Sequence, residues 1–328
     1  MKKTVRAIAA CTAIVLGGVL LAGVTDNDDP AADVELSAST PIDEPGLAAA
    51  VKSSSVDKLG QETRNAYAVA QLPDPVVEKI RGEKGKNWAF GSSTFPLATG
   101  EGNEGAPASA LYVAKRNGKD WQVEYEGTDG FFALVEQAPE AVLPAEEKQN
   151  LLAAKANTYA TKTGLALPWK VGDSWFMGGG PHGDDGRSKP FNSIDFNGGD
   201  GTVLAPADGT VYRSCVKNGS ALVKLVHANG FSTTYYHMTG LIKSKAGTKI
   251  KAGTKLGKIG TQLPCGGFAS GPHVHFSLLK GKNKVPVNGM TIGGWTFKEG
   301  AQSYQGSASH AGQTVGTGRP MKNFGAGK

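Results

Sequence analysis

Hydrophobic and polar residues in the first half of the chain follow a mixture of strand and helix periods. Residues 121–126 alternate with a period of two, as a half-buried strand does. Segments with aromatic and small apolar residues predict two further strands, at residues 88–95 and 108–114. Residues 74–81 are predicted to form a short helix, and residues 145–161 a longer helix with apolar residues on one side. Together these elements predict a small α+β domain.

The pattern changes after Thr163-Gly164, where glycine, lysine and β-branched residues become frequent. Short apolar runs separated by turn residues predict strands, and Asn229-Gly230 is a strong hairpin signal between two of them. These predicted strands are residues 209–213, 221–227, 231–237 and 273–278. The second half of the chain is therefore predicted to be an all-β domain.

The first residues have the features of a secretory signal peptide. Residues 1–6 form a basic region, and residues 7–24 are apolar and end in small residues. The alternative is an uncleaved membrane anchor at residues 7–24. A segment rich in Asp, Pro, Ala and Ser then predicts a flexible leader. The predicted organisation is a signal peptide at 1–24, a flexible leader at 25–58, an α+β pro- or accessory domain at 59–164 and the β domain at 165–328.

Charge divides the chain into two halves of opposite sign. From Leu165 to Lys328 there are nineteen Lys and Arg residues against seven Asp and Glu, whereas the preceding residues hold sixteen basic and twenty-two acidic ones. A basic half is attracted to anionic polymers. For an exported protein, anionic cell-wall polymers are favoured over nucleic acid, because no nucleic-acid-binding module is recognisable. The alternative is that the lysines between residues 243 and 258 only solvate a strand face.

Histidines are concentrated in the second half at spacings that suit a metal site. His273 and His275, in Gly-Pro-His-Val-His-Phe, would project from one face of a strand, where both can reach one ion. His182 and Asp195 lie upstream, as does His237, which follows two tyrosines. A histidine, a carboxylate and a second histidine form a usual catalytic zinc shell with an open fourth position. The predicted zinc ligands are therefore His182, Asp195 and His275.

Hydrolysis at such a site also needs a proton acceptor. Between Leu165 and the C-terminus the only glutamate is Glu299, far from the cluster in sequence, which excludes a zinc site with a glutamate base on a helix. His237 and His273 remain as the groups for proton transfer and for hydrogen-bonding the tetrahedral intermediate.

The order of these residues resembles that of the lysostaphin and β-lytic type zinc endopeptidases, which cut peptide bonds in bacterial peptidoglycan. Flanking segments at residues 205–211 and 285–295 agree with it, and the motifs in combination are specific. The gap from His182 to Asp195 is closer to the β-lytic branch than to the lysostaphin branch. The resemblance covers roughly the last half of the chain.

This resemblance implies an antiparallel β sandwich or barrel-like catalytic domain with the zinc at the floor of a groove. It implies that His182, Asp195 and His275 hold the zinc, and that His237 and His273 assist catalysis. It also implies a preference for glycine-containing peptide bonds, because an open groove lined by loops can approach a substrate that lacks side chains.

Several polar residues near the motifs have other interpretations. Family members often place a tyrosine near the cleft to stabilise the oxyanion; Tyr304 is a candidate, and the role stays unassigned. Asp184 and Asp185 compete as ligands, but a glycine-rich Asp segment is more often a turn. His227 and His310 are interpreted as solvated residues.

Two of the three cysteines, Cys215 and Cys265, lie beyond the signal peptide. An even pair in an oxidising compartment predicts a disulfide, which stabilises by about 3–4 kcal/mol in the chain-entropy model. A zinc–cysteine site is the weaker alternative, since no Cys-x-x-Cys spacing is present.

These observations predict a secreted, monomeric zinc endopeptidase acting on peptidoglycan peptides, made as a proenzyme. The first alternative is a non-catalytic wall-binding or amidase-activating module of the same fold, but all the proposed ligands are present. The second is a biotinyl-carrier type barrel, suggested by Ala205-Pro206-Ala207-Asp208-Gly209 and leaving the histidines unexplained.

Overall fold

The computed structural model describes residues 46–156, 158 and 160–327. The predicted signal peptide and residues 25–45 of the predicted leader lie outside the described residues. Within the described ranges, no helix is both long enough and apolar enough to cross a membrane. All described residues belong to one compact unit.

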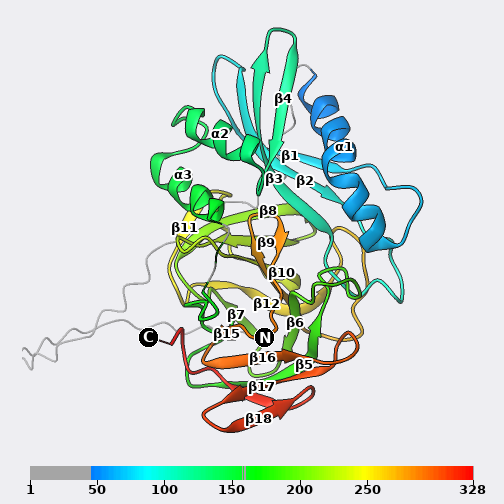
Figure 1. Ribbon diagram of the computed structural model, residues 1–328, viewed down its shortest axis with the longest axis vertical. Coiled ribbons are helices and arrows are strands. Elements are labelled where there is room, and N and C mark those ends of the chain that lie inside the picture. The colour runs from blue at the N-terminus through cyan, green and yellow to red at the C-terminus, as the bar shows by residue number, and fades with distance from the viewer. Residues whose placement is uncertain (1–45, 157, 159, 328) are drawn as a thin grey trace, which may run out of the picture. The chain divides into compact units, whose positions relative to one another are not determined.

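The N-terminal part contains a four-stranded antiparallel sheet with helices on both faces. In spatial order its strands are β1 (Val76–Gly82), β2 (Trp88–Phe95), β3 (Ala108–Asn117) and β4 (Asp120–Tyr125). Helix α1 (Leu47–Tyr67) packs on one face, whereas α2 (Asp129–Gln137) and α3 (Ala145–Leu152) cover the other (Figure 1). Side chains of β3 point alternately to the two faces of the sheet. Tyr112 packs with α1, whereas Leu111 and Val113 pack with α2.

Three of the predicted elements of this part are wrong or too long. Residues 76–82 form β1 and not the predicted helix, because Val76 to Gly82 pair with β2. Residues 47–58, assigned to a flexible leader, form the first half of α1. The predicted helix at 145–161 is shorter: α3 ends at Leu152 and continues only as the 3-10 turn Ala153–Lys155.

The serine-rich composition of α1 hides its amphipathic spacing. Its buried residues recur every four positions, and two of them, Ser55 and Thr63, are polar. Each hydroxyl donates to the carbonyl four residues earlier, at Val51 and Leu59, so that burial leaves no donor without a partner.

The C-terminal part is built on an antiparallel sheet of eleven strands, and the strands predicted in this half are confirmed. Its main order is β11-β8-β9-β10-β13-β6-β5-β19. In addition, β12 pairs with β10, β7 pairs with β12, and β14 pairs with β13. The strands along the main order are β11 (Thr248–Ile250), β8 (Gly209–Lys217), β9 (Ser220–Val226), β10 (Ser232–Thr239), β13 (Val274–Lys280), β6 (Ser193–Asn197), β5 (Ser174–His182) and β19 (Pro320–Lys322). The others are β7 (Thr202–Leu204), β12 (Lys255–Gln262) and β14 (Asn283–Lys284).

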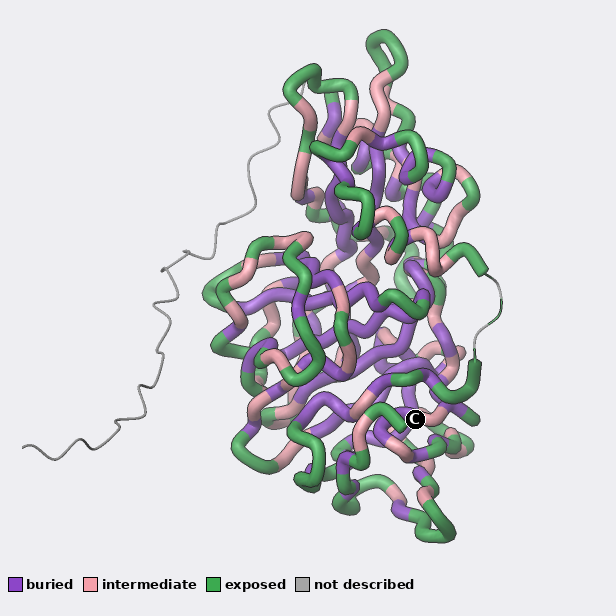
Figure 2. Tube along the Cα trace, turned by 90° about the vertical axis from the view of Figure 1, so that its left-hand side faces the viewer, coloured by how far each residue is buried: buried purple, intermediate pink, exposed green. Residues whose placement is uncertain are grey.

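A smaller antiparallel sheet near the C-terminus packs against the large one. Its strands are β15 (Thr291–Ile292), β16 (Trp295–Glu299), β17 (Gly306–His310) and β18 (Gln313–Gly316). Trp295 and Phe297 of this sheet join one apolar core with Phe196 and Phe276 of the large sheet. The strands of the large sheet are mostly buried, as Figure 2 shows along the chain trace.

The N-terminal and C-terminal parts share a buried interface. Phe90 of the first sheet packs with Tyr212 and Val226 of the large sheet. Lys224 of β9 forms a buried ion pair with Glu126, which follows β4. The N-terminal part therefore packs on β8 and β9, and β9 lies next to β10, the strand that carries His237.

Candidate metal centre

Adjacent strands in the middle of the large sheet bring the predicted ligands together. Asp195 of β6 lies directly opposite His275 of β13, so both side chains project from the same face. His182 is the last residue of β5, where two irregularities in the pairing with β6 shift the register before it. Such bulges re-aim a side chain, and here they direct His182 to the same point.

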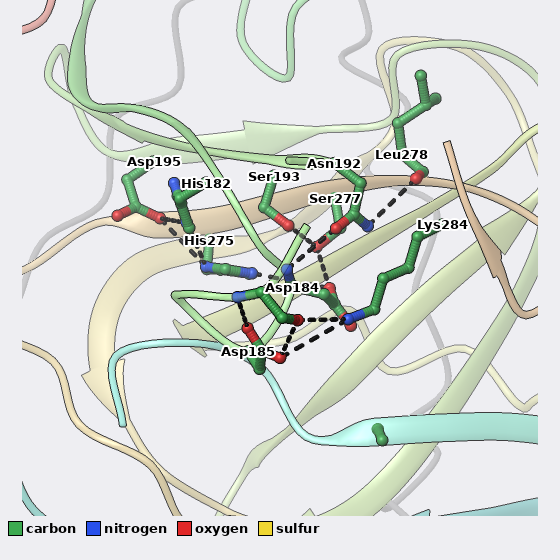
Figure 3. Close-up of polar contacts among 12 residues, drawn as sticks. His182, Asp184, Asp185, Asn192, Ser193, Asp195, His275, Ser277, Leu278 and Lys284 are labelled. Atoms are coloured by element: carbon green, nitrogen blue, oxygen red, sulfur yellow. Dashed lines mark hydrogen bonds and ion pairs between the residues drawn. The ribbon is translucent and has the colours of Figure 1, made fainter. Parts of the chain in front are cut away.

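The three side chains form a compact cluster (Figure 3). His182 Nε2 lies 3.2 Å from His275 Nδ1, and Asp195 Oδ1 lies 3.5 Å and 3.2 Å from these two atoms. Ligand atoms held at about 2.0–2.1 Å by a tetrahedral zinc ion lie about 3.3 Å from one another. The observed spacings therefore fit one zinc ion, and Asp195 Oδ1 is buried with no hydrogen-bond partner among the described residues.

Second contacts fix the ring orientation of both ligand histidines. Nδ1–H of His182 donates to the carbonyl of Gly180 at 2.7 Å, which leaves Nε2 as the ligand atom. His275 is turned the other way: Nδ1 faces the cluster and Nε2 faces Asp184 Oδ1 at 3.8 Å. Asp184 is in turn held by a hydrogen bond from the Ser277 hydroxyl at 2.5 Å.

Electrostatics within the cluster follow from this arrangement. Burial lowers the pKa of His182 to about 4, so that this ligand is neutral at pH 7. Burial alone would raise the pKa of Asp195, but the neighbouring His182 and His275 hold it well below its usual range. Burial alone would lower the pKa of His275, yet Asp184 and Asp195 outweigh it and raise the pKa to about 9 in the metal-free chain. A metal ion bound here would therefore displace a proton from His275.

His237 and His273 lie beside the three ligands. Nδ1–H of His237 donates to the main-chain carbonyl of Gln262 at 3.2 Å. Nδ1–H of His273 donates to the main-chain carbonyl of Gly271 at 2.8 Å. Their Nε2 atoms are buried and have no hydrogen-bond partner among the described residues. His273 Nε2 lies 3.7 Å from Asp195 Oδ1. The ring centroids of His237 and His273 are 4.7 Å apart. Both rings thus direct Nε2, the nitrogen that is not hydrogen-bonded to a main-chain carbonyl, to the side of the cluster.

The backbone at His237 departs from regular strand geometry. Its φ of +64° is left-handed, which is uncommon for a residue with a side chain and marks local strain of a kind found at functional sites. In a regular strand Tyr236 and His237 would point to opposite faces. Here the ring centroids of Tyr236 and His237 are 4.6 Å apart, so both side chains lie on the same side of the strand.

Tyr304 lines a cleft beside the cluster, together with Asp195 and His273. The sequence left the role of this tyrosine unassigned. Its ring stacks on His182 with centroids 4.1 Å apart, and its hydroxyl is buried without a hydrogen-bond partner among the described residues. Burial raises the pKa of Tyr304, so the hydroxyl keeps its proton at neutral pH. Gly179 makes room for this arrangement, because a Cβ there would lie 2.8 Å from Asp195 and 2.9 Å from Tyr304.

Two other histidines differ from their predicted solvation. His227 is buried, with Nδ1–H donating to the Asp208 carbonyl and Nε2 accepting from the Thr233 hydroxyl, both at 2.9 Å. His310 is half-exposed and stacks on Phe324. Neither lies in the metal cluster. Asp185 does form the expected turn, accepting the main-chain N–H groups of the residues that follow, whereas the neighbouring Asp184 supports a ligand.

The predicted disulfide between Cys215 and Cys265 is present. It ties the end of β8 to the segment that leads to His273. Tyr236 holds the same segment, because its hydroxyl accepts from Cys265 N–H at 2.9 Å and donates to the Gly266 carbonyl at 2.8 Å. One wall of the cleft is thus fixed covalently and by hydrogen bonds.

Fold and site together define a β-rich protein with a two-histidine, one-aspartate cluster suited to a metal ion. Residues 189–288 match the model of peptidase family M23, a family of metallopeptidases. Residues 189–288 therefore carry the sequence features of this family, and the resemblance to lysostaphin and β-lytic type enzymes is confirmed.

Individual relatives and a solved structure are similar to parts of this chain. Protease LasA of Pseudomonas aeruginosa is 30% identical over 289 residues, covering 82% of this chain and 65% of the relative. Beta-lytic metalloendopeptidase of Lysobacter enzymogenes is 29% identical over 155 residues, covering 44% of this chain and 85% of the relative. The solved structure of Pseudoalterin, a deep-sea M23 metalloprotease, is 30% identical and covers 48% of this chain and 97% of that one, with a TM-score of 0.43.

Proposed function

We propose that this protein is a zinc endopeptidase that hydrolyses peptide bonds, glycine-containing ones in particular, in bacterial peptidoglycan. The observation that carries the proposal is the convergence of two kinds of buried group at one point. His182, Asp195 and His275 have the spacing of a zinc shell, and His237 and His273 have buried Nε2 atoms without a hydrogen-bond partner among the described residues beside it. A purely structural metal site would have no use for the second set.

His182 Nε2, Asp195 Oδ1 and His275 Nδ1 would hold the zinc ion. When bound, zinc acidifies a water molecule and polarises a substrate carbonyl. The chain itself supplies the proton transfers: Nε2 of His237 or His273 can accept a proton, because the Nδ1–H of each is already committed to a main-chain carbonyl. Burial lowers the pKa of His237 to about 3, so this ring is neutral before the reaction.

The oxyanion needs a donor that keeps its proton. The Tyr304 hydroxyl meets this requirement, since the residue lines the cleft and the hydroxyl is protonated and has no partner among the described residues. The protonated form of His273 is a second donor after it accepts the proton.

The cleft beside the cluster has a volume of about 530 Å³, and five of the thirteen residues that line it are glycine, alanine or serine. Gly178, Gly179, Ala269, Ser270 and Gly271 lie along it. A groove of this kind lets the main chain of a peptide approach closely, which favours substrates with glycine at the scissile bond.

The cellular setting is part of the same proposal. A peptidase of cell-wall peptides must be exported, which agrees with the signal peptide predicted at residues 1–24 and with the disulfide. We propose that it acts as a secreted monomer, that the basic C-terminal part draws it to anionic wall polymers, and that the N-terminal part is removed on maturation of a proenzyme.

Metal analysis and product analysis of single variants test the proposal. His275→Ala and Asp195→Ala should lose stoichiometric zinc and all hydrolysis of pentaglycine and muropeptides, whereas His273→Ala should keep zinc and lose about a hundredfold or more in turnover. The matched control is His310→Ala, outside the cleft, which should keep both. Stoichiometric zinc and full activity in His275→Ala would show the ligand assignment to be wrong. Zinc binding without any released fragment would favour the non-catalytic module.

A further inference from the structure

The connection between β2 and β3 is much longer than the hairpin requires. Phe95 and Ala108 are paired directly across the two strands, so a two-residue turn would be enough to join them. The chain instead uses residues 96–107, which we call the bridging loop. Loops of this length in compact proteins usually have a function of their own.

One end of the bridging loop lies against the segment that follows the ligand His182. Ala106 N–H donates to the carbonyl of Asp184 at 2.7 Å. A Cβ at Gly105 would lie only 2.2 Å from the carbonyl carbon of Asp185, so the two main chains are in direct contact and glycine is required. This segment lies beside Tyr304, which lines the cleft, because a Cβ at Gly186 would be 2.9 Å from the Tyr304 hydroxyl oxygen.

The other end of the bridging loop lies against the opposite wall, which leads to His273. Leu97 N–H donates to the Cys265 carbonyl at 2.9 Å, and Gly100 N–H donates to the Gly267 carbonyl at 3.3 Å. A Cβ at Gly266 would lie 1.9 Å from the carbonyl oxygen of Leu97, so here too the contact is between main chains.

The bridging loop therefore contacts the chain on both sides of the cleft, beside Tyr304 and beside the segment that leads to His273. Ala106 is buried in a small cluster with Tyr236 and the two disulfide cysteines. Glu104 lines the same cleft as Asp195, His273 and Tyr304. The loop therefore lies at the edge of the cleft.

We propose that the bridging loop is an internal inhibitor that occupies one end of the substrate groove through its glycine-containing main chain. Its contacts are those expected of a bound peptide without side chains: main-chain N–H groups donate to wall carbonyls, and glycine lies where no side chain fits. An extended wall peptide cannot lie in the groove while the loop is in place. The proposal rests on the proposed function for the identity of the substrate.

Variants of the full chain test this. Gly105→Val places its side chain against the Asp185 main chain and should expel the loop, and replacement of residues 96–107 by Asn-Gly removes it. The matched control is Glu101→Val, which adds the same side chain at an exposed position of the loop. Zinc content and far-UV circular dichroism show which variants are folded.

Two measurements separate the loop from the chemistry. The first is kcat/KM for pentaglycine with the zinc-loaded full chain; the second is the Kd for pentaglycine with the metal-free full chain, by calorimetry. Both loop variants should improve each value by about tenfold or more, because the groove is open in a larger fraction of molecules, and Glu101→Val should match the unaltered protein.

The outcomes are distinct. If folded loop variants bind and cut pentaglycine no better than an active unaltered chain, the loop is not an inhibitor and the proposal is overturned, while the proposed function stands. If no form hydrolyses pentaglycine but the loop variants bind it more tightly, the proposed function fails and the loop proposal is supported. Should Gly105→Val not fold, the Asn-Gly replacement decides in the same way.

Discussion

Burial of His227 should make the stability of the protein depend on pH in a predictable direction. The ring is neutral in the folded protein, since Nδ1–H donates to Asp208 and Nε2 accepts from Thr233, which itself accepts from the Tyr235 hydroxyl at 2.8 Å. Burial lowers the pKa of His227 from about 6.5 to about 4. Between these two values the unfolded chain binds a proton that the folded chain does not.

The magnitude follows from the size of this shift. One pKa unit corresponds to about 1.4 kcal/mol, so the contribution of His227 to the unfolding free energy is about 3 kcal/mol. The contribution is fully present above pH 6.5 and is lost as the pH falls to 4. His227→Gln removes the titrating group, so the difference in unfolding free energy between the unaltered protein and this variant should fall by about 3 kcal/mol over that range.

Urea unfolding followed by tryptophan fluorescence, at several pH values from 7.5 to 4, measures this difference. Other buried histidines cancel, because both proteins contain them. The control Tyr235→Phe removes one hydroxyl of the same hydrogen-bonded chain and should cost about 1 kcal/mol at every pH, since no group that titrates in this range is lost. A difference curve for His227→Gln that stays flat from pH 7.5 to 4 would refute the reasoning.

Three further predictions concern the disulfide, the ion pair between the two parts and the junction that connects them. Replacing Cys215 and Cys265 by serine should lower the unfolding free energy by about 3–4 kcal/mol, and peptide mapping without reductant should recover these cysteines linked; two freely alkylated thiols in the folded protein would contradict this. Lys224→Met should cost about 3 kcal/mol or more because Glu126 stays buried without its partner, and the double variant with Glu126→Gln should recover at least half of the loss in the same urea assay. Limited trypsin digestion should cut first after Lys155 or Lys162, which are exposed at the junction of the two parts; an initial cut inside either sheet would argue against this junction as the maturation site.

The sequence by itself determined the chemistry of the site. Residue type and order selected His182, Asp195 and His275, and the i, i+2 spacing placed His273 and His275 on one side of a strand. The cysteine pair was identifiable because two of the three cysteines lie beyond the predicted signal peptide. Strand periodicity was equally clear in the β-rich half, where turn residues separate the runs.

Other features depended on contacts between distant parts of the chain. The segment at 76–82 became a strand because β2 offered a partner, and α1 formed although its buried face includes serine and threonine. His227 looked like a surface residue until Thr233 and Asp208 enclosed it.

The positions of Asp184 and of the bridging loop depended on tertiary structure alone. Asp184 supports His275 across a turn that the sequence could only describe as acidic and glycine-rich, and residues 96–107 reach the cleft from another sheet. Local spacing records the side to which a residue projects, but not which distant surface will cover that side. That is decided only when the strands pair and the two parts of the chain pack together.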